Sequence, residues 1–156
     1  MNARRAVSGF TLTEFAVTVA IAAILTTAAV PGFQGLVASQ RAKNSSSELF
    51  AALFNARSNA IMRNANVAVS PNAGGWANGW QIRDAGNNVL DNHGALSQVG
   101  ITGGPAAVTY NASGRLAAGS AAPVFLFTAQ SGGTTVNQCV SIDLGGRPYV
   151  MKGSTC

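Results

Sequence analysis

Hydrophobic and polar positions divide the chain into three stretches with different patterns. In the first, Leu12 to Val30, apolar residues follow one another almost without interruption, and no charged residue occurs between Glu14 and Arg41. About 20 apolar residues are enough for a helix to cross the hydrocarbon core of a bilayer. The run therefore predicts either a retained membrane helix or a signal peptide removed at the small residues around Ala28.

The second stretch, after Pro31, has apolar residues at spacings of three and four, which is typical of an amphipathic helix. Its apolar face would hold Leu49, Phe50, Leu53, Phe54, Ala56, Ala60 and Ile61, and its polar face Arg41, Lys43, Glu48, Arg57 and Arg63. One helix over residues 10–62, kinked at Pro31, would be roughly 80 Å long, so half of it would project from a small domain. The alternative is a break at Asn44–Ser47, with a serine capping a second helix.

In the third stretch, from about Val67 onward, short apolar runs alternate with turns rich in glycine and asparagine. Spacings this short favour antiparallel hairpins over parallel crossover units. The predicted strands are Ala65–Ser70, Gly79–Asp84, Ala107–Asn111, Val124–Ala129, Gln138–Asp143 and Pro148–Lys152. The expected fold class is α+β, with the long helix laid on a small antiparallel sheet formed by residues 63–156.

Composition narrows the possible functions. The 156 residues include 10 Lys or Arg and 5 Asp or Glu, and this charged share of 10% is far below the roughly 25% of an ordinary domain. The length suits one domain, and the apolar content excludes a disordered chain. With one histidine, two cysteines, no pairing of a nucleophile with a base and no phosphate loop, we expect no metal, no cofactor and no catalysis.

Glu14 distinguishes between the two interpretations of the apolar run. A carboxylate inside an apolar segment is costly, and a signal peptide has no use for one. The segment GFTLTEF, Gly9 to Phe15, follows a leader with Arg4 and Arg5, whose positive charge favours a cytoplasmic N-terminus. It resembles the type IV prepilin signature, in which a short basic leader ends in glycine, phenylalanine follows, and glutamate is the fifth mature residue. Pro31 corresponds to the proline that pilins commonly carry.

This resemblance implies that a prepilin peptidase cleaves residues 1–9 away between Gly9 and Phe10 and methylates the new amine of Phe10. The remaining chain would keep a side-chain net charge of +3, two less than the +5 of the precursor. Residues 10–31 would hold the protein in the bacterial inner membrane, with the head in the periplasm, and later enter a filament core. Glu14 would pair with the Phe10 amine of a neighbouring subunit and so set the assembly register.

The stretch from Glu48 to Leu90 carries a second resemblance, to minor pilins and pseudopilins of the GspH/FimT type. Its features are Ala56-Arg57-Ser58, Ala60-Ile61, Arg63 and the pair Gly79-Trp80, and the C-terminal CVSIDLGGRPYVMKGSTC is similar to the family's closing hairpin. The resemblance implies a minor pilin that primes or caps a type IV pilus, together with other pilins and the inner-membrane assembly platform. The alternative within the family is a pseudopilin of type II secretion.

The remaining candidates lie in the head. Cys139 and Cys156, in an exported protein, predict a disulfide, worth up to about 3 kcal/mol for a loop of this length. Trp80 is expected against the helix with Trp76 at its edge, and His93 in an exposed loop.

Some FimT-like pilins bind DNA through a C-terminal GRxR motif, which corresponds here to Gly146-Arg147-Pro148-Tyr149, with tyrosine replacing the second arginine. A basic patch of Arg115, Arg147 and Lys152, with Tyr149 available for stacking, is therefore a candidate for salt-sensitive DNA binding. The alternative is a hairpin turn with a solvated arginine.

Overall fold

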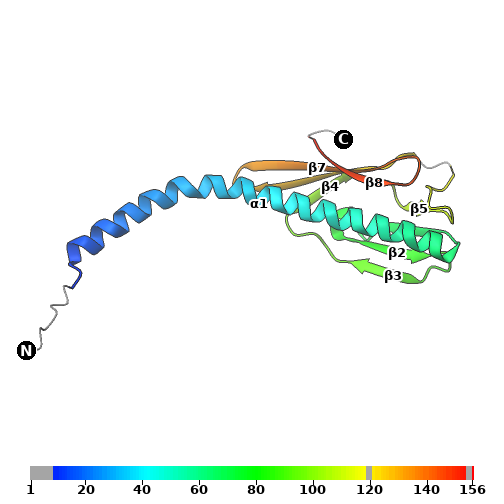
Figure 1. Ribbon diagram of the computed structural model, residues 1–156, viewed down its shortest axis with the longest axis horizontal. Coiled ribbons are helices and arrows are strands. Elements are labelled where there is room, and N and C mark those ends of the chain that lie inside the picture. The colour runs from blue at the N-terminus through cyan, green and yellow to red at the C-terminus, as the bar shows by residue number, and fades with distance from the viewer. Residues whose placement is uncertain (1–8, 119–120, 154–155) are drawn as a thin grey trace, which may run out of the picture.

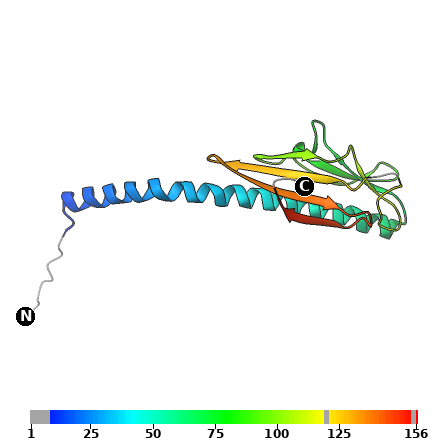
Figure 2. The same cartoon turned by 90° about the horizontal axis from the view of Figure 1, so that it is seen from above.

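The computed structural model describes residues 9–118, 121–153 and 156 of the chain. It contains a helix, α1 (Leu12–Arg63), whose first half projects away and whose second half lies along a β-rich head (Figures 1 and 2). This is the expected α+β architecture. Most of the predicted leader, including Arg4 and Arg5, lies outside the described residues.

Helix α1 is continuous through Asn44–Ser47, where a break was the alternative. The serines there face inward: Ser45 and Ser46 are buried, and the Ser46 hydroxyl donates to the Lys43 carbonyl at 2.9 Å. The helix ends at Arg63, and Asn64 caps it in the left-handed conformation. The segments Leu12–Thr27 and Gly32–Arg63 meet at 46°, and Pro31, which has no backbone N–H to donate, lies between them.

The head has two four-stranded antiparallel sheets where a single sheet was expected. The first has the order β3-β2-β1-β5 and the second β4-β6-β7-β8. The strands are β1 (Val67–Pro71), β2 (Trp80–Asp84), β3 (Val89–His93), β4 (Val99–Gly103), β5 (Val108–Tyr110), β6 (Val124–Ser131), β7 (Thr134–Ile142) and β8 (Pro148–Lys152), with a short 3-10 helix at Trp76–Asn78. The sequence did not predict β3 and β4, because β3 is a mostly exposed polar edge strand and β4 contains two glycines.

The core lies between α1 and the inner faces of the two sheets. Alanines at positions 38, 42, 52, 56 and 60 are buried and let the sheets approach the helix closely. The largest fully buried side chains are Trp80, Tyr110, Phe125, Phe127, Leu49 and Leu53. The buried face of α1 is narrower than the predicted apolar face: Phe54 and Ile61 are 57% and 51% exposed, although the Ile61 side chain lies beside Gly114 of the head.

Trp80 and Trp76 both pack in the core. The Trp76 ring meets Phe125 edge-on at 4.9 Å, and its indole N–H donates to the Pro105 carbonyl at 2.9 Å. His93 was predicted in an exposed loop, and this prediction is wrong: it ends β3 and stacks on Trp80 with the ring centres 4.2 Å apart. The backbone of β3 pairs with β2, and this pairing brings His93 opposite Trp80.

The β6–β7 hairpin reaches back along α1 towards the N-terminus (Figure 2). Its turn at Gly132 lies against the Gln34 side chain, and Thr134 lies beside Gly35. The head is therefore attached to the helix from Gln34 onward.

Candidate functional site

The predicted cleavage site lies just before the helix begins. Gly9 and Phe10 have no regular secondary structure, and Phe10 is 74% exposed. Thr11 has an extended backbone and forms the N-cap of α1. The bond between Gly9 and Phe10 is thus exposed and outside the helix, as a peptidase substrate must be.

Glu14 takes part in a capping box with Thr11. The Thr11 backbone N–H donates to Glu14 Oε2 at 2.9 Å and the Thr11 hydroxyl donates to the same oxygen at 2.8 Å, while the Glu14 N–H donates to the Thr11 hydroxyl at 3.3 Å. A carboxylate in the first turn also interacts favourably with the helix dipole. The other oxygen, Glu14 Oε1, accepts no hydrogen bond from the residues that the structure describes. A shallow hollow walled by Phe10, Thr13, Val17 and Thr18 lies beside Glu14.

The projecting half of α1 exposes large apolar side chains. They are Leu12, Phe15, Val17, Val19, Ile21, Ile24 and Leu25, each more than half exposed. Within the described residues no single helix passes the length and hydropathy criteria for a membrane span, whereas the bent pair Leu12–Thr27 and Gly32–Arg63 passes them together. An apolar surface of this extent marks a site for interaction with lipid or with other apolar helices.

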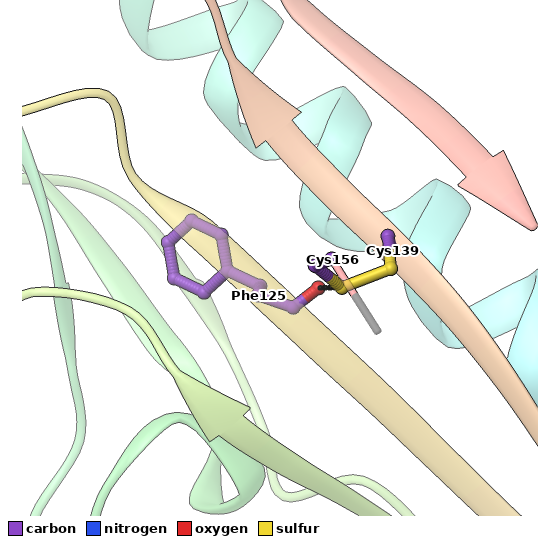
Figure 3. Close-up of a disulfide and its surroundings, with 3 residues drawn as sticks. All are labelled: Phe125, Cys139 and Cys156. Atoms are coloured by element: carbon purple, nitrogen blue, oxygen red, sulfur yellow. Dashed lines mark hydrogen bonds between the residues drawn. A yellow bond between two sulfur atoms is a disulfide. The ribbon is translucent and has the colours of Figure 1, made fainter. Parts of the chain in front are cut away.

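The predicted disulfide is present between Cys139 of β7 and Cys156, with an S–S distance of 2.03 Å (Figure 3). Cys139 is buried, and Cys156 Sγ lies 3.7 Å from the Phe125 carbonyl oxygen of β6. The bond fastens the C-terminus to the central strands of the second sheet. Among the described residues no group of three or more His, Cys, Asp or Glu side chains could hold a metal ion.

Two turns with the same hydrogen-bonding pattern meet at the end of the head near the C-terminal end of α1. Asn111–Arg115 and Asp143–Arg147 each begin with a side-chain oxygen that accepts the backbone N–H of the closing arginine, at 3.1 and 2.9 Å. Each has glycine in the left-handed conformation at its fourth position, with φ of 70° at Gly114 and 81° at Gly146. Arg57 of α1 donates to the Gly114 carbonyl at 2.8 Å and holds the first turn against the helix.

These turns place Arg115 and Arg147 close together, because Gly146 lies against the backbone of Gly114 and Arg115. The Arg147 guanidinium also pairs with Asp143 at 3.1 Å while its side chain stays 75% exposed. The backbone N–H of Arg147 holds the pKa of the Asp143 carboxyl below its usual range, with help from the guanidinium.

The other two residues of the predicted patch lie on β8. Tyr149 is 42% exposed and pairs with Ser141, close to the turn. Lys152 pairs with Gln138, and side chains alternate along a strand, so Tyr149 and Lys152 point to opposite faces of the sheet. The structure thus brings Arg115 and Arg147 together and leaves Lys152 about 16 Å along the strand from Arg147.

Two polar features of the structure were not predicted from the sequence. One is the contact of His93 Nε2 with Glu48 Oε2 of α1 at 3.4 Å, which could only be found once β3 was placed beside the helix. The other is a polar groove lined by Arg41. This groove forms only when α1, β4 and β6 are in place together.

The fold and the N-terminal motif together define a class of protein: one with a prepilin-type N-terminal motif, an exposed apolar helix and a β-rich head packed on the second half of that helix. Relationships to known proteins agree with this class. Residues 4–30 match the model of the prokaryotic N-terminal methylation motif, and residues 45–146 match the model of type II transport protein GspH. The chain belongs to the GspH family of minor pilins and pseudopilins, whose members are structural and not enzymatic.

Solved structures of the type IV minor pilin FimU from Pseudomonas aeruginosa share the fold. In one crystal form the TM-score is 0.62 at 21% identity, over 72% of this chain and 90% of FimU. In a second form the TM-score is 0.56 at 21% identity, over 70% and 91%. No curated protein sequence matches the chain significantly.

Proposed function

We propose that this protein is a minor type IV pilin, a structural subunit that primes or caps the pilus after a prepilin peptidase has removed residues 1–9 and methylated Phe10. The inner membrane stores the precursor through residues 10–31, and the assembly platform moves it into the filament with other pilins. The observation that carries the proposal is the placement of Glu14 on an exposed apolar helix, with one carboxylate oxygen unused by the described residues.

The geometry around Glu14 supports a role in register. Oε2 is occupied by Thr11, which leaves Oε1 to accept the methylated amine of Phe10 from an adjacent subunit. In a lipid or filament environment an unpaired carboxylate is costly, and a neighbouring ammonium relieves that cost. The amine and the carboxylate therefore pair best at one axial offset between two helices.

The experiment compares wild type with Glu14→Gln and Glu14→Ala in cells that assemble filaments. Leader removal, seen as a mobility shift, should stay largely intact in both variants, while the amount recovered in sheared filaments should fall strongly. Thr27→Ala, on the same exposed half of α1 but outside the hollow beside Glu14, is the control and should assemble normally. Normal incorporation of Glu14→Ala would refute the register role.

A pseudopilus of type II secretion is the alternative within the family. Deleting the gene separates the two: loss of surface pili with normal secretion supports the pilus, and loss of secretion with normal pili supports the pseudopilus.

DNA binding is a second candidate function, favoured by the contact between the Arg115 and Arg147 turns. Two arginines on touching turns can contact phosphates of one strand, and the exposed Tyr149 ring can stack on a base. A salt-dependent mobility shift with the processed chain in detergent should show binding at low salt that Arg147→Ala weakens and Lys43→Ala leaves unchanged. No binding at low salt removes this candidate.

A further inference from the structure

A polar groove of about 650 Å³ lies where the projecting helix enters the head. Arg41 of α1 lines one side, and the other side comes from Gln98 before β4 and from Thr128, Gln130 and Ser131 of β6. The lining also includes Gly132 of the β6–β7 turn, which lies against Gln34. Figure 2 shows this hairpin reaching back along α1 towards the N-terminus, so the groove is at that end of the head.

Arg41 is the sole charged residue among those that line the groove. Its side chain is half-buried, and it forms no ion pair with the part of the chain that the structure describes, where the ion pairs use Arg63, His93 and Arg147. The groove thus presents a positive charge surrounded by neutral hydrogen-bonding side chains. A carboxylate matches this arrangement, because guanidinium groups bind carboxylates with paired, charge-assisted hydrogen bonds.

The position of the groove favours a protein carboxylate over a lipid phosphate. Arg41 follows the end of the apolar run by eleven residues, or roughly 16 Å of helix. The headgroup layer extends only about 5–8 Å beyond the hydrocarbon core. Arg41 therefore lies beyond the lipid phosphates when the apolar run spans the membrane. In a filament of parallel helices, the same end of the head faces the head of the next subunit towards the cell.

We propose that the Arg41 groove is a docking site for an acidic side chain of the neighbouring pilin subunit. This inference rests on the proposed function, because it requires that the chain enters a filament. The Phe10–Glu14 contact would set the offset between helices, and the Arg41 contact would select which pilin head follows.

The test measures incorporation into sheared filaments relative to the membrane pool, using the full chain in cells. Arg41→Glu should lower incorporation about tenfold, whereas Arg41→Lys, which keeps the charge, should retain most of it. Lys43→Glu is the matched control: it makes the same charge change two residues away, on a side of the helix about 200° from Arg41, and should have little effect. Equal incorporation of Arg41→Glu and wild type, or equal losses for Arg41→Glu and Lys43→Glu, would overturn the proposal.

Two further measurements distinguish docking from a structural role of Arg41 and from lipid binding. Thermal unfolding of purified Arg41→Glu should match wild type within a few degrees, since Arg41 pairs with no described residue; a large drop would indicate a structural role and contradict the proposal. Binding to phosphatidylglycerol vesicles should be the same for both proteins. A loss of vesicle binding with normal incorporation would assign the groove to lipid. If the wild-type protein itself never enters filaments, the result contradicts the proposed function as a pilin. A defect limited to Arg41→Glu, in contrast, tests the groove.

Discussion

The carbonyl oxygen of Gly114 occupies the space where a side chain at position 146 would begin. Two turns that are distant in the sequence thus touch where Gly146 lies against the backbone of Gly114 and Arg115, and both glycines have a positive φ. This contact fixes the positions of Arg115 and Arg147 relative to each other.

Gly146→Ala should therefore destabilise the head by about 2 kcal/mol, because alanine meets both an unfavourable φ and the Gly114 carbonyl. Gly133→Ala is the matched control: its φ of 83° is similar to the 81° of Gly146, but nothing lies near the added methyl group. Thermal unfolding of the full chain in detergent should show the larger loss for Gly146→Ala. Equal losses would mean that the contact between the turns does not contribute.

Replacing both Cys139 and Cys156 with serine should lower the free energy of unfolding by about 3 kcal/mol, because the open chain gains entropy when it unfolds. Denaturant unfolding with and without a reductant measures the effect. Reductant should destabilise wild type by a similar amount and leave the double variant unchanged. A variant as stable as the oxidised wild type would show that β7 and β6 hold the C-terminal segment without the bond.

Acid should weaken the turn at Asp143. The pKa of this carboxyl is lowered in the folded state by the Arg147 backbone N–H, so its contribution is present above the ordinary value near 4 and is lost as the pH falls through the folded value. Asp143→Asn keeps a side-chain oxygen that can accept the Arg147 N–H, as Asn111 does for Arg115 in the other turn. Because asparagine does not titrate, this variant should lose part of the acid sensitivity. The unfolding temperatures of wild type and Asp143→Asn at pH 7 and pH 3 test this prediction. If both proteins lose the same number of degrees between the two pH values, the prediction is contradicted.

Tyr110→Phe should leave the protein as stable as wild type or stabilise it by up to about 1 kcal/mol. The Tyr110 hydroxyl is buried without a hydrogen-bond partner among the described residues, so its removal costs no bond. Exposed Tyr149→Phe serves as the control and should change nothing. A clear loss of stability in Tyr110→Phe alone would indicate that the hydroxyl has a partner.

The same residue gives a prediction at high pH. Burial raises the pKa of the Tyr110 hydroxyl, so its neutral form is favoured in the folded protein, and stability should fall as the pH rises above about 10. Tyr110→Phe should lose less stability than wild type between pH 9 and pH 11, measured by denaturant unfolding. Equal losses in the two proteins would contradict this prediction.

The long helix and the N-terminal motif could be predicted because their signals are local. The apolar run, the proline and the spacing of Gly9, Phe10 and Glu14 can all be seen within about thirty residues. The pairing of Thr11 with Glu14 was not predicted, although it has the usual three-residue spacing of a capping box.

The head was harder to predict because its organisation depends on contacts between distant segments. The polar strand β3 becomes visible only through its pairing with β2, and the wrong placement of His93 follows from missing it. The matching turns NASGR and DLGGR can be compared in the sequence, but nothing local indicates that Gly114 touches Gly146. The Arg41 groove needs α1, β4 and β6 in place together.

The one-sided attachment of the head to α1 has a mechanical consequence. The head touches the helix from Gln34 onward, and the helix continues towards the N-terminus without it. In a filament under tension, the pull would pass from helix to helix through the projecting segments, and the β-sheets would carry almost none of it. The head would then be free to differ between subunits in its turns and grooves without weakening the fibre.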